Sequence, residues 1–372
     1  MSASLIPLRL GLQQRVLPVY RVPFFEALAN ACTGGLGVFA GKARPGESIE
    51  EAKGLEKAVY FPARNRHWLR GPLYICWQSG FLTWLEVWQP DILVAEANPR
   101  YLRTPAAIDW MHGRGRPVIG WGLGAPAING LLAGFRRGPR QDFVSRFDAL
   151  LVYSRRGAEE YAALGFNREH IFVAPNAMAP RPPNPPPERP LPTCPATVLF
   201  VGRLQERKRV DLLLRSCAAL PENMRPRLWV VGDGPARAEL ETLAGQVYPE
   251  TQFWGAQYGD NLVKLFRGAD LFVLPGTGGL AVQQAMSFGL PVVVADGDGT
   301  QSDLVRPENG WCVPPGDLPA LQTALASALA DLPGLRRMGA ESFRIVAQEV
   351  NVEAMVEAFA ACINTVMKKG AA

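Results

Sequence analysis

The sequence predicts an α/β protein of two domains, each built on a parallel sheet with helices on both faces. Its 372 residues exceed the length at which a single hydrophobic core keeps growing, so two domains are expected. A proline-rich stretch interrupts the chain near its middle, and short apolar runs alternate with helical patterns on either side of it. Alternation of this kind is typical of a parallel sheet whose two faces are both covered.

The domain boundary is predicted at residues 180–195, which contain nine prolines. Such a segment is extended and semi-rigid, and it cannot lie inside a helix or a central strand. We expect an N-terminal domain over 1–180, a linker over 181–195, a second domain over 196–350, and a helix over 351–372 that either stands apart or packs back on the first domain. A ligand for another protein is the alternative interpretation of the proline-rich stretch.

The second domain shows its elements clearly. Apolar runs bounded by glycine or proline predict six strands, which are expected at 197–202, 227–232, 251–255, 270–276, 291–296 and 310–315. Apolar residues spaced by three and four predict helices between them, at 210–220, 236–247, 261–269 and 279–289. The order is that of one doubly wound domain.

The first domain shows the same pattern less regularly. Four segments read as strands that end in loops, at 89–96, 116–122, 148–154 and 170–176, and two helices are expected at 104–115 and 155–166. Open parallel sheets bind ligands at the carboxyl ends of their strands. We therefore expect the functional residues of both domains in the loops that follow these strands.

Composition and charge narrow the class of protein. The six cysteines are scattered without zinc-ligand spacing, which indicates reduced thiols, and no apolar run approaches the ~18 residues of a membrane span. We expect a cytoplasmic protein. The net charge is +5, and residues 1–180 hold 21 Lys and Arg against 14 Asp and Glu, so an anionic partner or surface is expected for that half. The basic residues form no nucleic-acid-binding motif, so no nucleic acid partner is expected.

A glycine and two cations follow the first strand of the second domain. Gly202 ends the run 197–202, and Arg203 and Lys208 come directly after it. The glycine lets a ligand approach the backbone, while a guanidinium fork and an ammonium point charge suit a diphosphate. A solvated basic loop is the alternative interpretation.

Two further turns precede helices. Gly232 opens the tight turn Gly-Asp-Gly-Pro after the second strand. After the fourth strand a glycine-rich loop leads into a helix, and its free backbone amides are suited to bind an anion; this loop comprises Gly276, Thr277, Gly278 and Gly279.

Together these three segments resemble the family-4 (group 1) retaining glycosyltransferases, whose signatures GRLxxxKG, GxGP and ExFGxxxxEAMAxGxPV they echo. The resemblance implies the GT-B fold, in which two Rossmann-like domains face each other across a cleft. It implies a nucleotide-sugar donor, a saccharide or lipid-linked acceptor, and transfer without a cofactor or a metal. The alternatives are a nucleotide-sugar epimerase of the same fold and a non-catalytic nucleotide-sugar-binding subunit.

The resemblance also assigns roles. Arg203 and Lys208 are the catalytic groups, which neutralise the leaving diphosphate, and Gly279 and Leu280 offer it backbone amides. Gln284 faces the ribose. The paired glutamates of the family fall here on Gly276 and Gln284, so the carboxylate expected near the donor sugar is absent.

The acceptor side is expected in the first domain. Tyr20 and Arg21 lie in an early loop, and Gly122 and Gly124 flank Leu123, where relatives often carry a histidine. A strand-to-helix turn that packs into the core is the alternative for the early loop.

Two stretches combine tryptophan or leucine with arginine, at 63–88 and 130–141. This composition suits peripheral contact with an anionic membrane surface, at the inner face of the membrane. Tryptophans buried in a helical core are the alternative for 63–88.

Overall fold

The computed structural model describes residues 5–44, 47, 49–126, 133–186, 190, 195–278, 280–297 and 299–370. The chain divides into two compact units. Unit 1 comprises Met1–Pro180 with Asn351–Ala372, and unit 2 comprises Arg181–Val350. The C-terminal residues thus belong to unit 1, although unit 2 separates them from the rest of it along the chain.

Unit 1 is built on a seven-stranded parallel sheet with the order β3-β2-β1-β6-β7-β8-β9. Its strands are β1 (Leu10–Val16), β2 (Leu36–Gly41), β3 (Val59–Pro62), β6 (Ile92–Glu96), β7 (Val118–Gly122), β8 (Ala149–Val152) and β9 (Ile171–Val173). The central strands are buried almost throughout, as expected when helices cover both faces.

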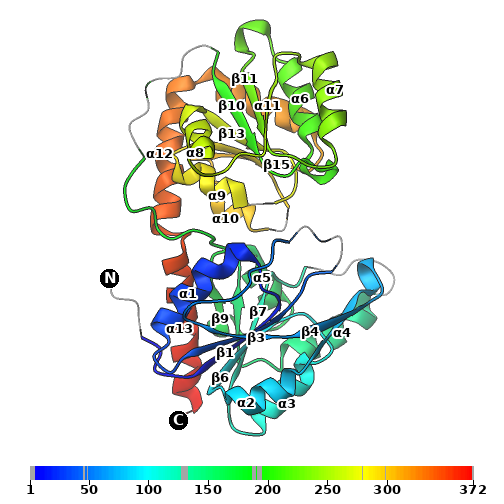
Figure 1. The fold of residues 1–372 in the computed structure, drawn as a ribbon, viewed down its shortest axis with the longest axis vertical. Coiled ribbons are helices and arrows are strands. Elements are labelled where there is room, and N and C mark those ends of the chain that lie inside the picture. The colour runs from blue at the N-terminus through cyan, green and yellow to red at the C-terminus, as the bar shows by residue number, and fades with distance from the viewer. Residues whose placement is uncertain are drawn as a thin grey trace. The chain divides into compact units, whose positions relative to one another are not determined.

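The helices of unit 1 lie on both faces of this sheet (Figure 1). They are α1 (Val22–Ala31), α2 (Phe81–Trp88), α3 (Thr104–His112), α4 (Ala133–Val144), α5 (Arg155–Ala163) and α13 (Val352–Gly370), with 3-10 turns η1 (Val19–Arg21), η2 (Gly71–Leu73) and η3 (Arg168–His170). α1 and α13 pack against each other, and α13 covers β8 and β9. Buried side chains from α2, α3, α4 and α5 form a hydrophobic core cluster with residues of the sheet.

A separate two-stranded antiparallel hairpin is formed by β4 (Arg64–Trp68) and β5 (Ile75–Ser79). Exposed and half-buried side chains alternate along β4, as the two-residue period of a strand requires. The helical-core interpretation of 63–88 is therefore wrong for the hairpin strands, and the α-helical part of the stretch is α2 at its end.

Unit 2 carries a six-stranded parallel sheet with the order β12-β11-β10-β13-β14-β15. Its strands are β10 (Thr197–Val201), β11 (Arg227–Val231), β12 (Gln252–Gly255), β13 (Leu271–Leu274), β14 (Val292–Ala295) and β15 (Gly310–Val313). Each predicted strand of this domain is present and is shorter than its predicted segment, and in β10, β11, β13 and β15 the glycine or proline that ends the predicted segment lies outside the strand.

The helices of unit 2 also lie on both sides of its sheet. They are α6 (Val210–Ala218), α7 (Arg237–Val247), α8 (Gly259–Gly268), α9 (Leu280–Ser287), α10 (Gln301–Leu304), α11 (Leu318–Ala330) and α12 (Leu332–Gln348), with 3-10 turns η4 (Glu206–Lys208) and η5 (Glu222–Met224). Figure 1 shows α6, α7 and α11 on one side and α8, α9 and α12 on the other.

Both sheets have a topological switch point beside their first strand. In unit 1 the strand order reverses between β1 and β6, and in unit 2 it reverses between β10 and β13. The loops leaving two such neighbouring strands diverge to opposite faces, which leaves a crevice where α/β proteins bind ligands. The two switch points are therefore the places at which to look for functional residues.

Within the part of the chain that the structure describes, no single helix is both long and apolar enough to cross a membrane, and only the successive helices α12 and α13 meet that test when taken together across their bend.

Candidate functional site

Three turns meet at the switch point of unit 2, those that follow β10, β11 and β13. The Leu204 N–H donates to the Asp233 carbonyl at 2.9 Å, and the Ala236 N–H donates to the Leu204 carbonyl at 3.1 Å. The Thr277 N–H donates to the Arg207 carbonyl at 3.1 Å. The segments that the sequence singled out separately are thus tied together through their backbones.

Glycine is required where these turns touch. Gly232 has φ +137°, and a Cβ there would overlap the carbonyl of Gly202. Gly276 is buried, and a Cβ there would overlap the backbone of Arg207 and Lys208. Gly276 is therefore part of a close backbone packing.

Lys208 reaches across to the glycine-rich loop. Its Nζ donates to the Thr277 carbonyl at 2.7 Å, and a Cβ on Gly278 would collide with that nitrogen. Burial, with a smaller contribution from the neighbouring Arg207, lowers the pKa of Lys208 to about 8. Arg203, which follows Gly202, is exposed. Lys208 is thus held against the glycine-rich loop, whereas Arg203 is open to solvent.

The loop continues into α9, which begins at Leu280. The side chain of Gln284 is exposed on this helix, and the backbone carbonyl of Gln284 accepts from the Ser287 hydroxyl at 2.7 Å. Gly279 lies outside the described residues. The exposed amide of Gln284 is consistent with a ligand-facing position, and the free amides at the start of α9 favour an anion.

In unit 1, Arg21 lies in the core rather than on an open loop. Its guanidinium donates to Asn176 Oδ1 at 2.5 Å and to the Ala177 carbonyl at 3.3 Å. It also lies over the rings of Tyr153, at 5.1 Å, and Trp121, at 5.4 Å. Tyr20, by contrast, keeps 38% of its surface exposed. Of this pair, only Tyr20 is accessible to an acceptor in the described structure.

The two glycines after β7 also pack closely. A Cβ on Gly122 would meet the Tyr161 hydroxyl at 2.5 Å, and Gly124 has φ +141° with the Glu160 carboxyl against it. Leu123 between them is half exposed. This loop thus follows β7 at the carboxyl edge of the sheet, two strands from β1.

One polar residue at this edge was not singled out from the sequence. Glu96 ends β6, where its Oε2 accepts from the Arg15 N–H at 2.6 Å and its own N–H donates to Gln13 Oε1 at 2.9 Å. Burial raises the pKa of Glu96 to about 7, against the opposing effect of the Arg15 contact. A lone acid at the end of the buried run ILVA was the signal that could have found it.

The described residues contain no group of three or more His, Cys, Asp and Glu side chains placed to hold a metal ion. His67 Nδ1 lies 2.9 Å from the Tyr74 hydroxyl, and His112 Nε2 lies 3.0 Å from Asp148 Oδ2. Both histidines are thus engaged by neighbouring side chains.

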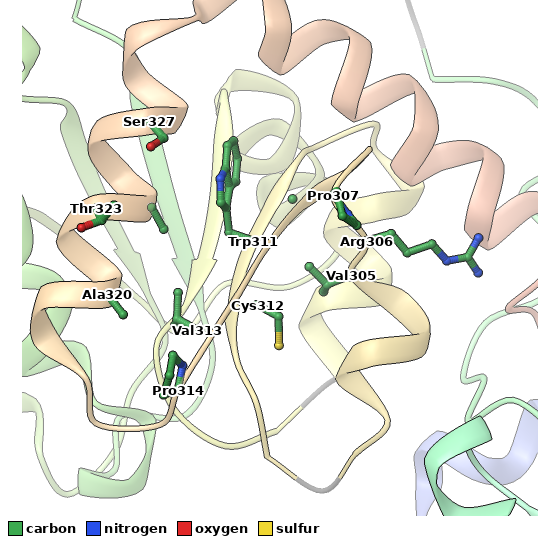
Figure 2. A pocket seen from close by; sticks show the side chains of 12 residues that line it. Val305, Arg306, Pro307, Trp311, Cys312, Val313, Pro314, Ala320, Thr323 and Ser327 are labelled. Atoms are coloured by element: carbon green, nitrogen blue, oxygen red, sulfur yellow. The ribbon is translucent and has the colours of Figure 1, made fainter. Parts of the chain in front are cut away.

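A pocket of about 610 Å³ lies elsewhere in unit 2, against the edge strand β15 and α11 (Figure 2). Trp311, Cys312 and Thr323 are among the residues that line it. None of the site residues predicted from the sequence lines this pocket.

Comparison with known proteins gives a family for part of the chain. Residues 185–344 match the family described as glycosyl transferases group 1. The chain is 35% identical over 151 residues to the sulfoquinovosyl transferase SQD2 of Arabidopsis thaliana, covering 39% of this chain and 28% of that protein. It is 38% identical over 122 residues to a GDP-mannose-dependent alpha-mannosyltransferase of Mycobacterium tuberculosis, covering 32% of this chain and 30% of that one. The matches thus span about a third of the length of these curated relatives.

Solved structures resemble the whole chain. The lipopolysaccharide outer core galactosyltransferase WaaB matches with a TM-score of 0.67 and 18% identity, over 96% of this chain and 99% of that chain. Anabaena Alr3699/HepE in complex with UDP matches with a TM-score of 0.66 and 16% identity, over 96% and 99%. At these identities the likeness shows the fold. The chain accordingly has the GT-B fold of two Rossmann-like domains, and its residues 185–344 match the family of group 1 glycosyltransferases.

Proposed function

We propose that the chain transfers a sugar from a nucleotide-sugar donor to a saccharide or lipid-linked acceptor, with retention of configuration, in the assembly of a bacterial-type surface glycan. The observation that carries this proposal is the joining of three turns at the switch point of unit 2, with Lys208 against the loop that leads into α9 and Arg203 exposed in the turn after β10. Cations, free amides and a helix N-terminus together suit a diphosphate.

The relatives support the same chemistry. Their names include a GDP-mannose-dependent mannosyltransferase and a lipopolysaccharide core glycosyltransferase, LpsE of Rhizobium meliloti. HepE was solved with UDP-glucose, and a TarM mutant with fondaparinux, alpha-GlcNAc-glycerol and UDP. We propose for this chain a nucleoside diphosphate sugar as donor, bound by unit 2, and an acceptor bound by unit 1.

In this proposal the chain acts by positioning the substrates and by neutralising charge. Arg203 and Lys208 stabilise the negative charge that grows on the leaving diphosphate, and the amides at the start of α9, including that of Leu280, add to this. Gln284 accepts a hydrogen bond from the ribose. We propose that no bound metal is needed, because fixed cations and amides do the work that a metal would do.

A non-catalytic nucleotide-sugar-binding subunit is the second candidate. It is favoured by Gly276 and Gln284, which leave the donor side of unit 2 without the two carboxylates of the family. Release of free nucleoside diphosphate from the bound donor separates the two candidates, because only an enzyme turns over.

We also propose that the protein is cytoplasmic and makes peripheral contact with an anionic membrane. The hairpin β4–β5 supports this contact, since Trp68, Leu69 and Leu73 are 43%, 61% and 68% exposed around its tip. Arg64, Arg66 and Arg70 are exposed beside them. No Asp or Glu occurs between Glu56 and Glu86, so the hairpin strands and tip carry only positive charge.

The donor site is tested by thermal shift of the whole chain with UDP, GDP and ADP and their sugars, in EDTA. We expect one nucleotide series to raise the melting temperature without added metal. Arg203→Ala and Lys208→Ala should each weaken diphosphate binding by about 1.5–3 kcal/mol, because each removes a charge-assisted contact.

Lys264→Ala is the matched control, since Lys264 is exposed on α8. If Arg203→Ala and Lys208→Ala both bind diphosphate as tightly as the native chain, the assignment of the site is overturned. Binding that appears only with Mg²⁺ or Mn²⁺ would overturn the metal-free proposal.

A further inference from the structure

The pocket beside β15 runs along an edge of the unit 2 sheet. In the described structure β15 is the last strand of that sheet, and it pairs with β14 alone. Every residue of β15 lines the pocket, and α11 contributes Thr323 and Ser327 (Figure 2). Small-molecule pockets span roughly 300–1,000 Å³. The volume of about 610 Å³ is therefore enough to hold a small molecule.

The backbone of Cys312 faces the outer side of this edge. The Asn309 carbonyl accepts from the Val292 N–H of β14 at 3.1 Å. Further along, the Val313 carbonyl accepts from the Asp296 N–H at 2.8 Å. In a parallel pair every second residue turns its backbone groups toward the partner strand, so the N–H and the carbonyl of Cys312 point away from β14. In the described part of the chain, neither group has a hydrogen-bond partner.

The residues on either side of Cys312 limit what this edge can bind. The Gly310 N–H donates to the Arg306 carbonyl at 2.9 Å. Pro314 has no N–H, and its carbonyl accepts from the Asp317 N–H at 3.3 Å. Over the described residues 310–314, Cys312 thus supplies the one outward donor. An added strand would need a longer series of such groups, so the edge is suited to a small molecule rather than to a peptide.

The charge in the pocket is already paired. Among the described residues that line it, Arg306 is the only one with a charged side chain. Its Nη1 donates to Glu349 Oε1 at 3.1 Å, and its Nη2 donates to the other oxygen of that carboxylate. Most of the remaining lining side chains are apolar, and the Thr323 hydroxyl donates to the Pro319 carbonyl at 3.0 Å. A paired cation and apolar walls favour an uncharged ligand.

We propose that this pocket binds an uncharged, flat nitrogen heterocycle of the nucleobase kind. A ring oxygen or nitrogen of the ligand accepts from the Cys312 N–H, and an adjacent ligand N–H donates to the Cys312 carbonyl. Nucleobases carry such an acceptor and donor side by side, which the two backbone groups of one residue match. The inference goes beyond the proposed function, because it uses none of the diphosphate turns and expects a base without phosphate to bind.

The test uses the whole chain with uracil, hypoxanthine and adenine as probes, and with 1,3-dimethyluracil as a flat probe that has no N–H. Binding is measured by saturation-transfer NMR titration. Cys312→Pro removes the outward N–H, which makes no bond within the sheet, and an edge strand tolerates proline at such a position. Cys312→Ala is the matched control, since it removes the thiol and keeps the N–H. Ser327→Trp fills the pocket from an exposed position on α11, so it tests the site even if Cys312→Pro does not fold.

We expect at least one base to bind the native chain and Cys312→Ala equally well. Cys312→Pro should bind that base on the order of tenfold more weakly, because the ligand acceptor loses its donor. Uracil should bind more tightly than 1,3-dimethyluracil by a similar factor if it is the base selected, and Ser327→Trp should bind none of the probes.

Three results would overturn the inference. They are the failure of every base to bind the native chain, binding that Ser327→Trp leaves unchanged, and binding that a folded Cys312→Pro leaves unchanged. Nucleoside diphosphate affinity measured on the same variants reports on the proposed function separately, because neither Cys312 nor Ser327 belongs to the diphosphate turns.

Discussion

Gly276 shows how a single residue sets the limits of the donor site. A Cβ at this position would overlap the backbone of Arg207 and Lys208. A glutamate, which the resemblance to the family leads one to expect here, could be accommodated only if η4 moved away from the glycine-rich loop. The close packing of the two turns therefore leaves no room for a carboxylate side chain.

Gly276→Ala should destabilise unit 2 by about 1–3 kcal/mol, because an added methyl group meets backbone atoms that cannot rotate away. It should also weaken diphosphate binding by displacing Lys208. Gly276→Glu should reduce or redirect donor use for the same reason. The measurement is urea unfolding together with nucleotide affinity.

Gly245→Ala is the control, because a Cβ there meets nothing within 4 Å and α7 gains a better helix former. It should be neutral or stabilising by about 0.5–1 kcal/mol. Equal stability of the Gly276 and Gly245 variants would contradict the packing argument.

At the scale of single residues, the sequence predicted site residues that lie within one segment and missed those whose surroundings come from distant segments. Arg203 and Lys208 stand next to a glycine turn, so their chemistry is visible in one segment. Burial in the folded sheet raises the pKa of Glu96, and that burial depends on strands that lie far apart in the chain. Arg21 is a second case, since it is buried by Trp121 on β7 and by Asn176 after β9, both far away in the chain.

At the scale of elements, the first domain was the harder half to predict. β1 carries Gln13, Gln14 and Arg15 in succession, which breaks the apolar pattern of a buried strand. The hairpin supplies partners for part of this run, because Gln78 on β5 binds the Gln13 side chain and the Gln14 carbonyl. The polar residues of β1 and the hairpin contact each other, so neither element could be predicted from its own segment alone.

The hairpin carries the prediction for membrane contact. Changing Arg64, Arg66 and Arg70 together to Glu should abolish binding to phosphatidylcholine vesicles that contain phosphatidylglycerol, since each arginine contributes ~1 kcal/mol toward an anionic surface. Vesicle flotation measures this binding. The native chain should bind these vesicles and not pure phosphatidylcholine.

The same triple change at Arg227, Lys264 and Arg267, which are exposed in unit 2, controls for net charge. If both triple variants lose binding equally, the hairpin is not the contact surface and only overall charge matters.

At the scale of the whole molecule, α13 makes unit 1 discontinuous. Phe359 lies 4.9 Å from Phe24 and 5.1 Å from Trp121 between ring centroids, and the Val352 N–H donates to the Ala179 carbonyl at 3.0 Å. The prolines mark the end of the first segment of unit 1, but the sequence of the C-terminal helix does not indicate which sheet it packs against. Only the contacts with α1, β8 and β9 reveal which sheet it covers.

We predict that the fragment 181–350 folds by itself and binds the same nucleotide as the whole chain, because its sheet, core and diphosphate turns are contiguous. The fragment 1–180 should unfold without cooperativity, and a separate peptide of 351–372 should restore a cooperative transition. Circular dichroism during urea unfolding measures both. A cooperative transition of 1–180 alone would show that α13 is dispensable.

Because α13 belongs to unit 1, unit 1 cannot be completed on the ribosome until unit 2 has been synthesised. The strands of unit 1 emerge first, yet the helix that covers β8 and β9 is translated only after all of unit 2 has been made. During that interval the nascent chain presents an uncovered apolar surface, which is what chaperones recognise and what misassembled chains share. The part of the protein that is synthesised first is therefore the last to be completed, and rapid folding of unit 2 shortens the time for which its neighbour is exposed.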